Sequence, residues 1–168
     1  MCLTVNVYLD TCVLSDESFV DWLSSEAQGV RASISSVVYM ERRRQLLSRR
    51  RDPEKLELVL REANIPVVPF DKHMGARASE HMSEQPKVCP ACNNLDWADI
   101  MILSNIKDPQ ALLVTRNVRD FLPYLPESHI KTPEQIRSMF RWDEYRRNPV
   151  SFPLIHSSKA SVLNPVLT

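Results

Sequence analysis

Leu3–Thr11, which reads LTVNVYLDT, is the stretch from which the fold of this 168-residue chain can be worked out. Its β-branched and aromatic residues predict a short strand, and that strand ends at Asp10. In an open α/β sheet, ligands collect just beyond the carboxyl ends of the strands. Asp10 is therefore placed for chemistry, although an aspartate after a strand is also a common turn or helix-capping residue.

The composition is that of an ordinary globular domain, with 43% hydrophobic and 25% charged residues. Equal numbers of acidic and basic residues give zero net charge, which argues against bulk capture of nucleic acid but leaves room for a local basic patch. Neither a membrane span nor a secretory signal is evident, so we expect a cytoplasmic protein without membrane attachment. The two glycines form no phosphate loop, which disfavours Rossmann and P-loop nucleotide binding.

Strand and helix patterns alternate along the chain. This alternation predicts an α/β fold, a three-layer α/β/α sandwich with a central parallel sheet. We assign residues 1–145 to this domain and residues 146–168, where proline and serine recur, to a C-terminal tail. Later strands are predicted at 31–34, 65–70, 111–115 and from 130, and helices at about 17–28, 37–50, 53–63 and 72–82, and from about 96 and 133.

Glu41 is predicted on the apolar side of the second helix. It lies four residues after Val37 and three after Val38, so these side chains share one helical face. A solvated helix would keep its glutamate on the far side. A functional position is one interpretation, and a surface pair with Arg44 or Gln45 is the other.

Further acidic residues occur where predicted strands end or helices begin. Asp99 lies near the start of a strongly apolar helix, for which Asp96 already suffices as a cap. Asp120 and Asn117 follow the predicted strand 111–115, where a turn is the competing explanation. Oxygen donors that converge on one edge are what Mg²⁺ or Mn²⁺ prefers. Such an ion can lower the pKa of a bound water and hold a phosphodiester for displacement.

Six arginines lie within ten positions, at 42–44 and 49–51. Helical spacing spreads them around the helix, so we expect a solvated, salt-bridged surface for most of them. The planar guanidinium also suits phosphate, and we expect one or two near Glu41 to contact RNA, with Arg44 as the candidate.

Four short motifs, in this order, resemble those of PIN-domain ribonucleases, and in particular the VapC toxins of prokaryotic toxin–antitoxin pairs. The resemblance covers about residues 3–140. The motifs are YLDTCVL at 8–14, SVVYME at 36–41, ADIMI at 98–102 and LVTRNVRDF at 113–121.

The resemblance implies a Mg²⁺- or Mn²⁺-dependent endoribonuclease that hydrolyses phosphodiester bonds in structured RNA such as tRNA. It also implies a homodimer that is held silent by a cognate antitoxin protein. The implied catalytic and metal-binding acids are Asp10, Glu41, Asp99 and Asp120. The implied pocket or RNA contacts are Thr11, Thr115, Arg116, Asn117 and Arg44. The fourth acid is assigned to Asp120 because Asn117 is a neutral amide. Cys12 stands where the family often has asparagine, which predicts one polar contact fewer near Asp10.

Cys89 and Cys92 form a Cys-x-x-Cys pair in a polar segment at 83–94. Such a pair is half of a zinc site, and no second pair exists. We therefore expect a plain loop here rather than zinc, with an intramolecular zinc site and a redox or inter-subunit role as the alternatives.

Three other functions compete with a nuclease. The main alternative is a non-cleaving PIN-like module that binds RNA or protein, since the neutral Asn117 weakens the metal site. A haloacid-dehalogenase-like phosphatase generally needs a second acid two residues after the first, where this chain has Cys12. A receiver domain needs paired acids after the first strand and a phosphoacceptor that only Asp71 offers.

Overall fold

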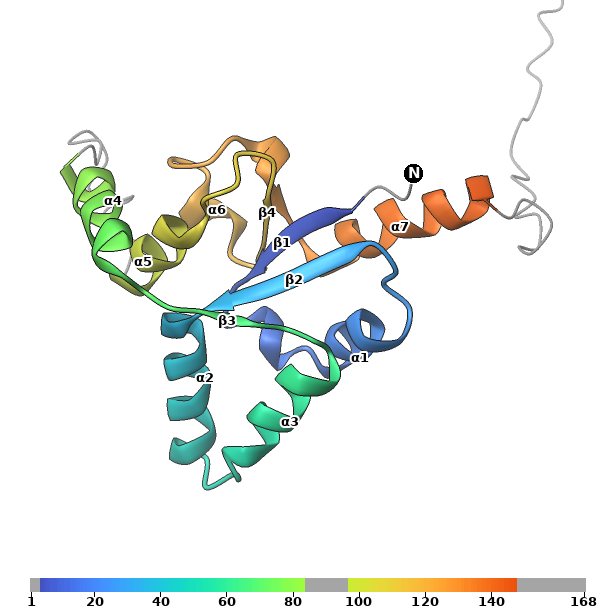
Figure 1. Ribbon diagram of the computed structural model, residues 1–168, viewed down its shortest axis with the longest axis horizontal. Coiled ribbons are helices and arrows are strands. Elements are labelled where there is room, and N and C mark those ends of the chain that lie inside the picture. Colours follow the sequence, from blue (N-terminus) through green and yellow to red (C-terminus); the bar gives the residue numbers. More distant parts are fainter. Residues whose placement is uncertain (1–3, 84–96, 148–168) are drawn as a thin grey trace, which may run out of the picture.

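Five parallel strands form one sheet, in the order β3-β2-β1-β4-β5 (Figure 1). The structure is a computed structural model that describes residues 4–83 and 97–147. The predicted α/β fold with a central parallel sheet is confirmed. The strands are β1 (Val5–Leu9), β2 (Val30–Ser35), β3 (Val67–Val68), β4 (Leu112–Val114) and β5 (Ile130–Lys131).

Helices cover the sheet, with α1 and α3 on one side of it and α5 and α6 on the other (Figure 1). The predicted segment 83–94, with its Cys89–Cys92 pair, and the predicted cap Asp96 lie outside the described residues apart from Ser83. The helices are α1 (Glu17–Ser25), α2 (Ser36–Ser48), α3 (Glu54–Glu62), α4 (Lys72–Ser83), α5 (Trp97–Asn105), α6 (Val118–Phe121) and α7 (Pro133–Arg147), with short 3-10 turns η1 (Val13–Ser15) and η2 (Glu127–His129).

Strand β1 lies at the centre of the sheet. Val7 pairs with Ala32 of β2 on one side and Leu112 of β4 on the other. Val7 and Leu9 are fully buried, as expected for a strand between two neighbours in a sheet covered on both faces. The burial of β1 fixes its register, and the register fixes where Asp10 leaves the sheet.

Side chains from the flanking loops define where the first helices begin. The Asp16 carboxylate accepts a hydrogen bond from the Phe19 N–H (3.1 Å) at the start of α1, and the Ser35 hydroxyl accepts one from the Val38 N–H (3.1 Å) at the start of α2. Such caps satisfy backbone donors that have no partner within the helix.

Helices α2 and α3 end with the same backbone motif but different residues. The residue two positions after each helix has a positive φ, 53° for Arg50 and 52° for Asn64. In α2, the Arg50 and Arg51 N–H groups donate to the Leu47 and Leu46 carbonyls (3.0 and 2.9 Å). This is the Schellman arrangement, whose left-handed position favours glycine or asparagine.

Helix α7 is attached to α1 by aromatic and cationic contacts. The Arg137 guanidinium lies 5.6 Å from the Phe19 ring centre and 5.9 Å from that of Trp22. The Phe140 ring meets the Trp22 ring edge-on, with 6.2 Å between the ring centres. The helix continues to Arg147, and the rest of the predicted tail, 148–168, lies outside the described residues. None of the helices in the described part of the chain is both long and apolar enough to span a membrane.

Candidate functional site

The candidate site lies where the sheet changes its winding direction. β1 continues to its neighbour β2 and β4 continues to its neighbour β5, so the connections that leave the carboxyl ends of β1 and β4 run in opposite directions, which leaves a crevice for ligands between them. Asp10 follows β1 and Thr115 follows β4. The Asp10 N–H donates to the Val114 carbonyl (3.0 Å), which holds these two strand ends together.

Asp10 is buried, with only 7% of its surface exposed, and three donors orient its carboxylate. Oδ1 accepts a hydrogen bond from the Thr11 N–H (2.6 Å). Oδ2 accepts one from the Thr115 hydroxyl (2.7 Å) and one from the Cys12 thiol (3.1 Å). A carboxylate offers about four lone-pair directions. One acceptor position of Asp10 is therefore left for a ligand.

Thr11 joins the two acids of the first two motifs. Its hydroxyl donates to Glu41 Oε2 at 2.5 Å, while its N–H binds Asp10. Glu41 thus faces the strand ends, and the surface pair with Arg44 or Gln45 that the sequence left open is not formed; Gln45 instead accepts from Arg42 (3.2 Å). The structure brings Asp10 and Glu41 together through one residue.

Asp99, Asp120 and Asn117 lie on the helices around this crevice. Asp99 is half-buried in the first turn of α5, and α5 packs against α2, the helix that carries Glu41. Asp120 is half-buried in the short helix α6. The Asn117 side chain is exposed and does not cap α6, whereas its N–H donates to the Thr115 hydroxyl (2.9 Å).

The donor set fits a hard divalent cation in its chemistry. Asp10 keeps one acceptor position, and Glu41 Oε1 has no hydrogen-bond donor among the described residues. Carboxylate oxygens of this kind suit Mg²⁺ and Mn²⁺. In the described residues, however, no group of three or more His, Cys, Asp or Glu side chains is close enough to hold one ion. Among the residues that the structure describes, Asp10 and Glu41 are thus joined closely and no third acid gathers with them to hold one ion.

Cys12 makes a polar contact that the sequence analysis did not predict. Its thiol donates to Asp10 Oδ2 and accepts from the Arg116 N–H (3.3 Å). Burial, together with the negative charge of Asp10, raises the pKa of this thiol, so it stays protonated and serves as a donor. The expectation of one polar contact fewer beside Asp10 is thus wrong, because the Cys12 sulfur makes that contact with Asp10 Oδ2.

Arg116 is held by two acids rather than left free to contact a ligand. Its Nη2 atom lies 2.5 Å from Asp16 Oδ2 and 2.9 Å from Glu134 Oε1. The hydrogen bonds to Asp16 and Glu134 raise the pKa of the guanidinium. Arg116 therefore connects the end of β4 to the first turns of α1 and α7, at the rim of the crevice.

Comparison with known protein families matches residues 7–122 to the PIN domain. The chain belongs to the PIN domain family. PIN domains are typically metal-dependent nucleases, and the matched residues include Asp10, Glu41, Asp99 and Asp120. No curated protein matches the sequence.

Two solved structures are similar to this chain. A chain of a toxin–antitoxin complex from Klebsiella pneumoniae is 19% identical, with a TM-score of 0.54, and the match covers 76% of this PIN domain chain and 97% of that chain. A chain of VapBC2 from Rickettsia felis bound to a promoter DNA fragment is 19% identical, with a TM-score of 0.49 and coverage of 76% and 98%. At such identity the likeness shows the fold alone.

Sequence reasoning missed the residues that support the site from a distance. The sequence analysis singled out neither Asp16 nor Glu134, yet both bind Arg116. Arg116 is 100 positions from Asp16. No local spacing signals such a contact, which becomes evident only from the order of the strands.

Proposed function

We propose that this PIN domain is a VapC-like endoribonuclease that hydrolyses phosphodiester bonds in structured RNA such as tRNA. The observation that carries the proposal is the joint orientation of Asp10 and Glu41 by Thr11 at the switch point of the sheet. Oriented carboxylates at this edge, that of Asp10 buried and that of Glu41 half-buried, are suited to hold a hard cation next to a phosphate.

The proposed metal ligands are Asp10, Glu41, Asp99 and Asp120, with Mg²⁺ or Mn²⁺ as the cofactor. When bound, the ion supplies an activated water and charge neutralisation at the phosphate. Thr115 and Cys12 fix the rotamer of Asp10, and Thr11 fixes the distance between Asp10 and Glu41. Burial of Asp10 in a low-dielectric crevice strengthens its interaction with a cation.

Arg44 is the proposed RNA contact beside the acids. It is exposed, follows Glu41 by three residues on α2, and makes no ion pair or hydrogen bond within the described residues. Arg116 is assigned to the pocket wall, because Asp16 and Glu134 already satisfy its charge. The exposed Asn117 remains a candidate contact at the rim.

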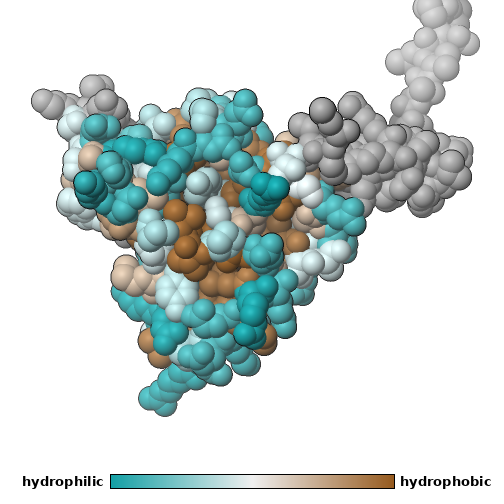
Figure 2. All heavy atoms as spheres, viewed as in Figure 1, coloured by the Kyte–Doolittle hydropathy of each residue, from teal (hydrophilic) through white to brown (hydrophobic). Residues whose placement is uncertain are grey.

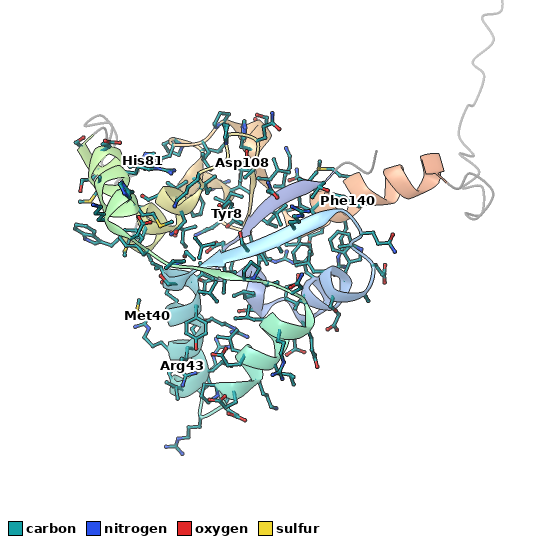
Figure 3. All side chains as sticks on the ribbon, viewed as in Figure 1. Tyr8, Met40, Arg43, His81, Asp108 and Phe140 are labelled. Carbon is teal, nitrogen blue, oxygen red and sulfur yellow. The ribbon has the colours of Figure 1, made fainter. Side chains whose placement is uncertain are left out.

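Exposed apolar side chains support a protein partner. Met40 on α2 is 61% exposed and projects away from the molecule in Figure 3, and Leu47 on α2 and Trp97 on α5 are exposed as well. Met40 and Leu47, seven residues apart, lie on the same side of α2, and α5, which carries Trp97, packs against α2; exposed apolar residues that form one patch mark interaction sites. We propose a cognate antitoxin as the partner, a homodimer as the assembly and the cytoplasm as the place of action, in line with the Klebsiella complex that shares the fold.

The test is cleavage of bulk tRNA and total RNA by the purified chain with Mg²⁺ or Mn²⁺. We expect cutting that chelator abolishes and that the Asp10→Asn variant lacks. Glu26→Gln, at an exposed position just after α1, is the matched control and should cut like the native chain. Cutting that persists in Asp10→Asn would contradict the proposal.

A non-cleaving PIN module is the second candidate. Two observations favour it: no third acid gathers with Asp10 and Glu41 in the described residues, and position 117 is an amide. This function predicts RNA binding that chelator does not change and no cleavage with either ion. Cleavage gained by Asn117→Asp alone would show a weakened metal site.

A further inference from the structure

A cavity lined by four basic and three acidic side chains lies between η1, α1, α2 and α3, beside the candidate site. It has a volume of about 590 Å³. Leu14 lines it, and the Leu14 N–H donates to the Asp10 carbonyl (3.4 Å). Arg42 also lines it and directly follows Glu41 in α2. The cavity is therefore linked to the candidate site through the chain at Leu14 and Arg42, and it continues along α2 toward the start of α3.

The cations of this cavity form no ion pair with an acid of the described residues. Arg42, Arg50, Arg51 and Lys55 line it, together with the acids Glu17, Asp21 and Asp52. The four ion pairs of the described residues lie elsewhere, and the Asp52 carboxylate is engaged by the Glu54 N–H at the start of α3 (3.0 Å). The segment between α2 and α3 forms the lower tip of the molecule in Figure 1, and mainly hydrophilic residues cover that tip in Figure 2. The expectation of a salt-bridged surface is therefore not met here.

Arg42 shows that these cations repel one another. Burial of its guanidinium is the largest cause of a lowered pKa, and the charges of Arg49 and Arg51 lower the pKa further, while Glu17 opposes them. Within the described residues, the Arg42 side chain donates its hydrogen bond to the neutral Gln45. A phosphate in the cavity would compensate for the lost hydration of Arg42 with a charge-assisted hydrogen bond, and its negative charge would offset the repulsion between the cations.

Arg50 occupies a position at which an arginine is costly. It has a φ of 53° in the Schellman motif of α2, whereas α3 has the better-suited Asn64 at the same point. A left-handed conformation of a residue with a long side chain is uncommon. Such backbone strain often occurs at functional residues, so we infer a function for the Arg50 side chain, which is exposed and lines the cavity.

We propose that this cavity binds backbone phosphates of the RNA, so that the strand runs from the candidate site along α2 toward α3. The proposal rests on the proposed function, because it takes RNA as the ligand. From Glu41 to the end of α2 at Ser48 the path is roughly 10 Å along the helix axis, and Arg50 and Arg51 follow in the turn after it. Arg42 binds the phosphate nearest the acids, and Arg50, Arg51 and Lys55 bind those farther away.

The test measures binding of labelled bulk tRNA in chelator by the full-length Asp10→Asn variant at several salt concentrations. The double change Arg42→Gln with Arg51→Gln should weaken binding by roughly tenfold at low salt and reduce the salt slope by about 0.7 to 0.9 for each phosphate that is no longer neutralised. The matched control is Arg31→Gln with Arg61→Gln, which removes the same charge from exposed positions around another cavity. Equal weakening in both double variants, or no change in either, would overturn the proposal.

Arg50→Gly distinguishes the contribution of the Arg50 side chain to RNA binding from the effect of the backbone conformation on stability. It removes one cation but suits the left-handed position, so the melting temperature should rise while RNA binding weakens. Unchanged RNA binding would count against the cavity even if the other arginine variants fold poorly. Cleavage is measured separately, with Asp10 intact. If this protein cuts RNA and all arginine variants bind RNA as tightly as their parent, binding of phosphates in the cavity is refuted while the nuclease function stands. If the protein does not cut RNA but its RNA binding depends on the cavity arginines, the nuclease function is refuted while binding of phosphates in the cavity stands.

Discussion

Thr115 is the residue on which the orientation of Asp10 depends most directly. It is fully buried, its hydroxyl donates to Asp10 Oδ2 (2.7 Å), and the same oxygen accepts the Asn117 N–H. Removing this hydroxyl leaves a buried carboxylate with fewer donors and a backbone N–H without its acceptor. One side chain therefore links β4, β1 and the start of α6.

We expect Thr115→Val to lower both Mn²⁺ affinity and RNA cleavage by about 10- to 100-fold, as is usual when a group that supports a metal ligand is removed. Thr115→Ser keeps the hydroxyl and should retain most of both. Calorimetric titration with Mn²⁺ and initial cleavage rates measure the two effects. A Val variant with native Mn²⁺ affinity and activity would show that Asp10 does not need this donor.

Arg50 offers a prediction at the same scale for stability. Replacing it by glycine relieves about 1–2 kcal/mol of left-handed strain, and the greater chain entropy of glycine offsets about half, which leaves a gain of about 0.5–1 kcal/mol. Asn64→Gly at the equivalent position of α3 should change stability by less, because asparagine already tolerates this conformation. Urea unfolding of both variants gives the comparison. A destabilised Arg50→Gly would mean that the arginine side chain supports the fold.

At the scale of elements, Arg116 joins three segments that are far apart in sequence. It leaves the end of β4 and binds Asp16 at the start of α1 and Glu134 in the first turn of α7. Burial of Asp16 raises its pKa, but hydrogen bonds from Arg116, Ser18 and the Phe19 N–H outweigh burial, so the pKa of Asp16 lies below its usual value. Protonation of Asp16 therefore weakens the junction.

The sign of the pH dependence follows from this lowered pKa. The stability that Asp16 contributes is fully present above the unfolded pKa, about 4, and is lost as the pH falls through the lower folded value. We expect Asp16→Asn to melt below the native chain at pH 7, with a difference that shrinks below about pH 4. Glu26→Gln is the control, since the Glu26 side chain is exposed and makes no hydrogen bond or ion pair among the described residues. A pH-independent difference for Asp16→Asn would mean that the charge of Asp16 does not stabilise the junction.

The sequence predicted most elements because their determinants are local. Leu3–Thr11 has the pattern of a strand, and the structure forms β1 at Val5–Leu9, directly before Asp10. Helices predicted from about 37 and 72 are found as α2 and α4, and local caps mark both starts: Ser35 accepts the Val38 N–H, and Asp71 accepts the His73 and Met74 N–H groups. Candidate acids could be selected because they follow strands or begin helices. Whether they bind a metal stays a prediction.

Contacts between distant segments could not be predicted in the same way. The Thr11–Glu41 hydrogen bond and the Arg116 junction depend on how α2 and α7 pack on the sheet. The strand order also follows from packing of whole elements, since five parallel strands can be wound in several ways. The substitution at Cys12 was misjudged for a related reason: the thiol reaches Asp10 only in the folded backbone.

For the whole molecule, the strand order decides where chemistry can occur. Placing β1 between β2 and β4 brings the loop that carries Asp10 and Thr11 beside the end of β4 and over the first turns of α2. The acids are thereby held by the rigid centre of the fold rather than by a free loop. A ligand that binds there must stabilise the entire domain, because its site exists only in the folded chain.

Metal binding should therefore raise the melting temperature of the intact chain. At an ion concentration of 100 Kd, the folded state gains about 2.7 kcal/mol, which shifts the melting temperature of a domain of this size by several degrees. We expect Mg²⁺ or Mn²⁺ to produce this shift in the native chain and not in Asp10→Asn, whereas Glu26→Gln should respond as the native chain does. Ca²⁺ serves as the control for ion selectivity, since it prefers more ligands at longer distances. Thermal unfolding in chelator and in each ion measures the effect without RNA, so it tests the metal site independently of cleavage. Equal shifts in the native chain and Asp10→Asn would place the ion elsewhere on the surface, and the carboxylates joined by Thr11 would then serve RNA binding or the fold alone.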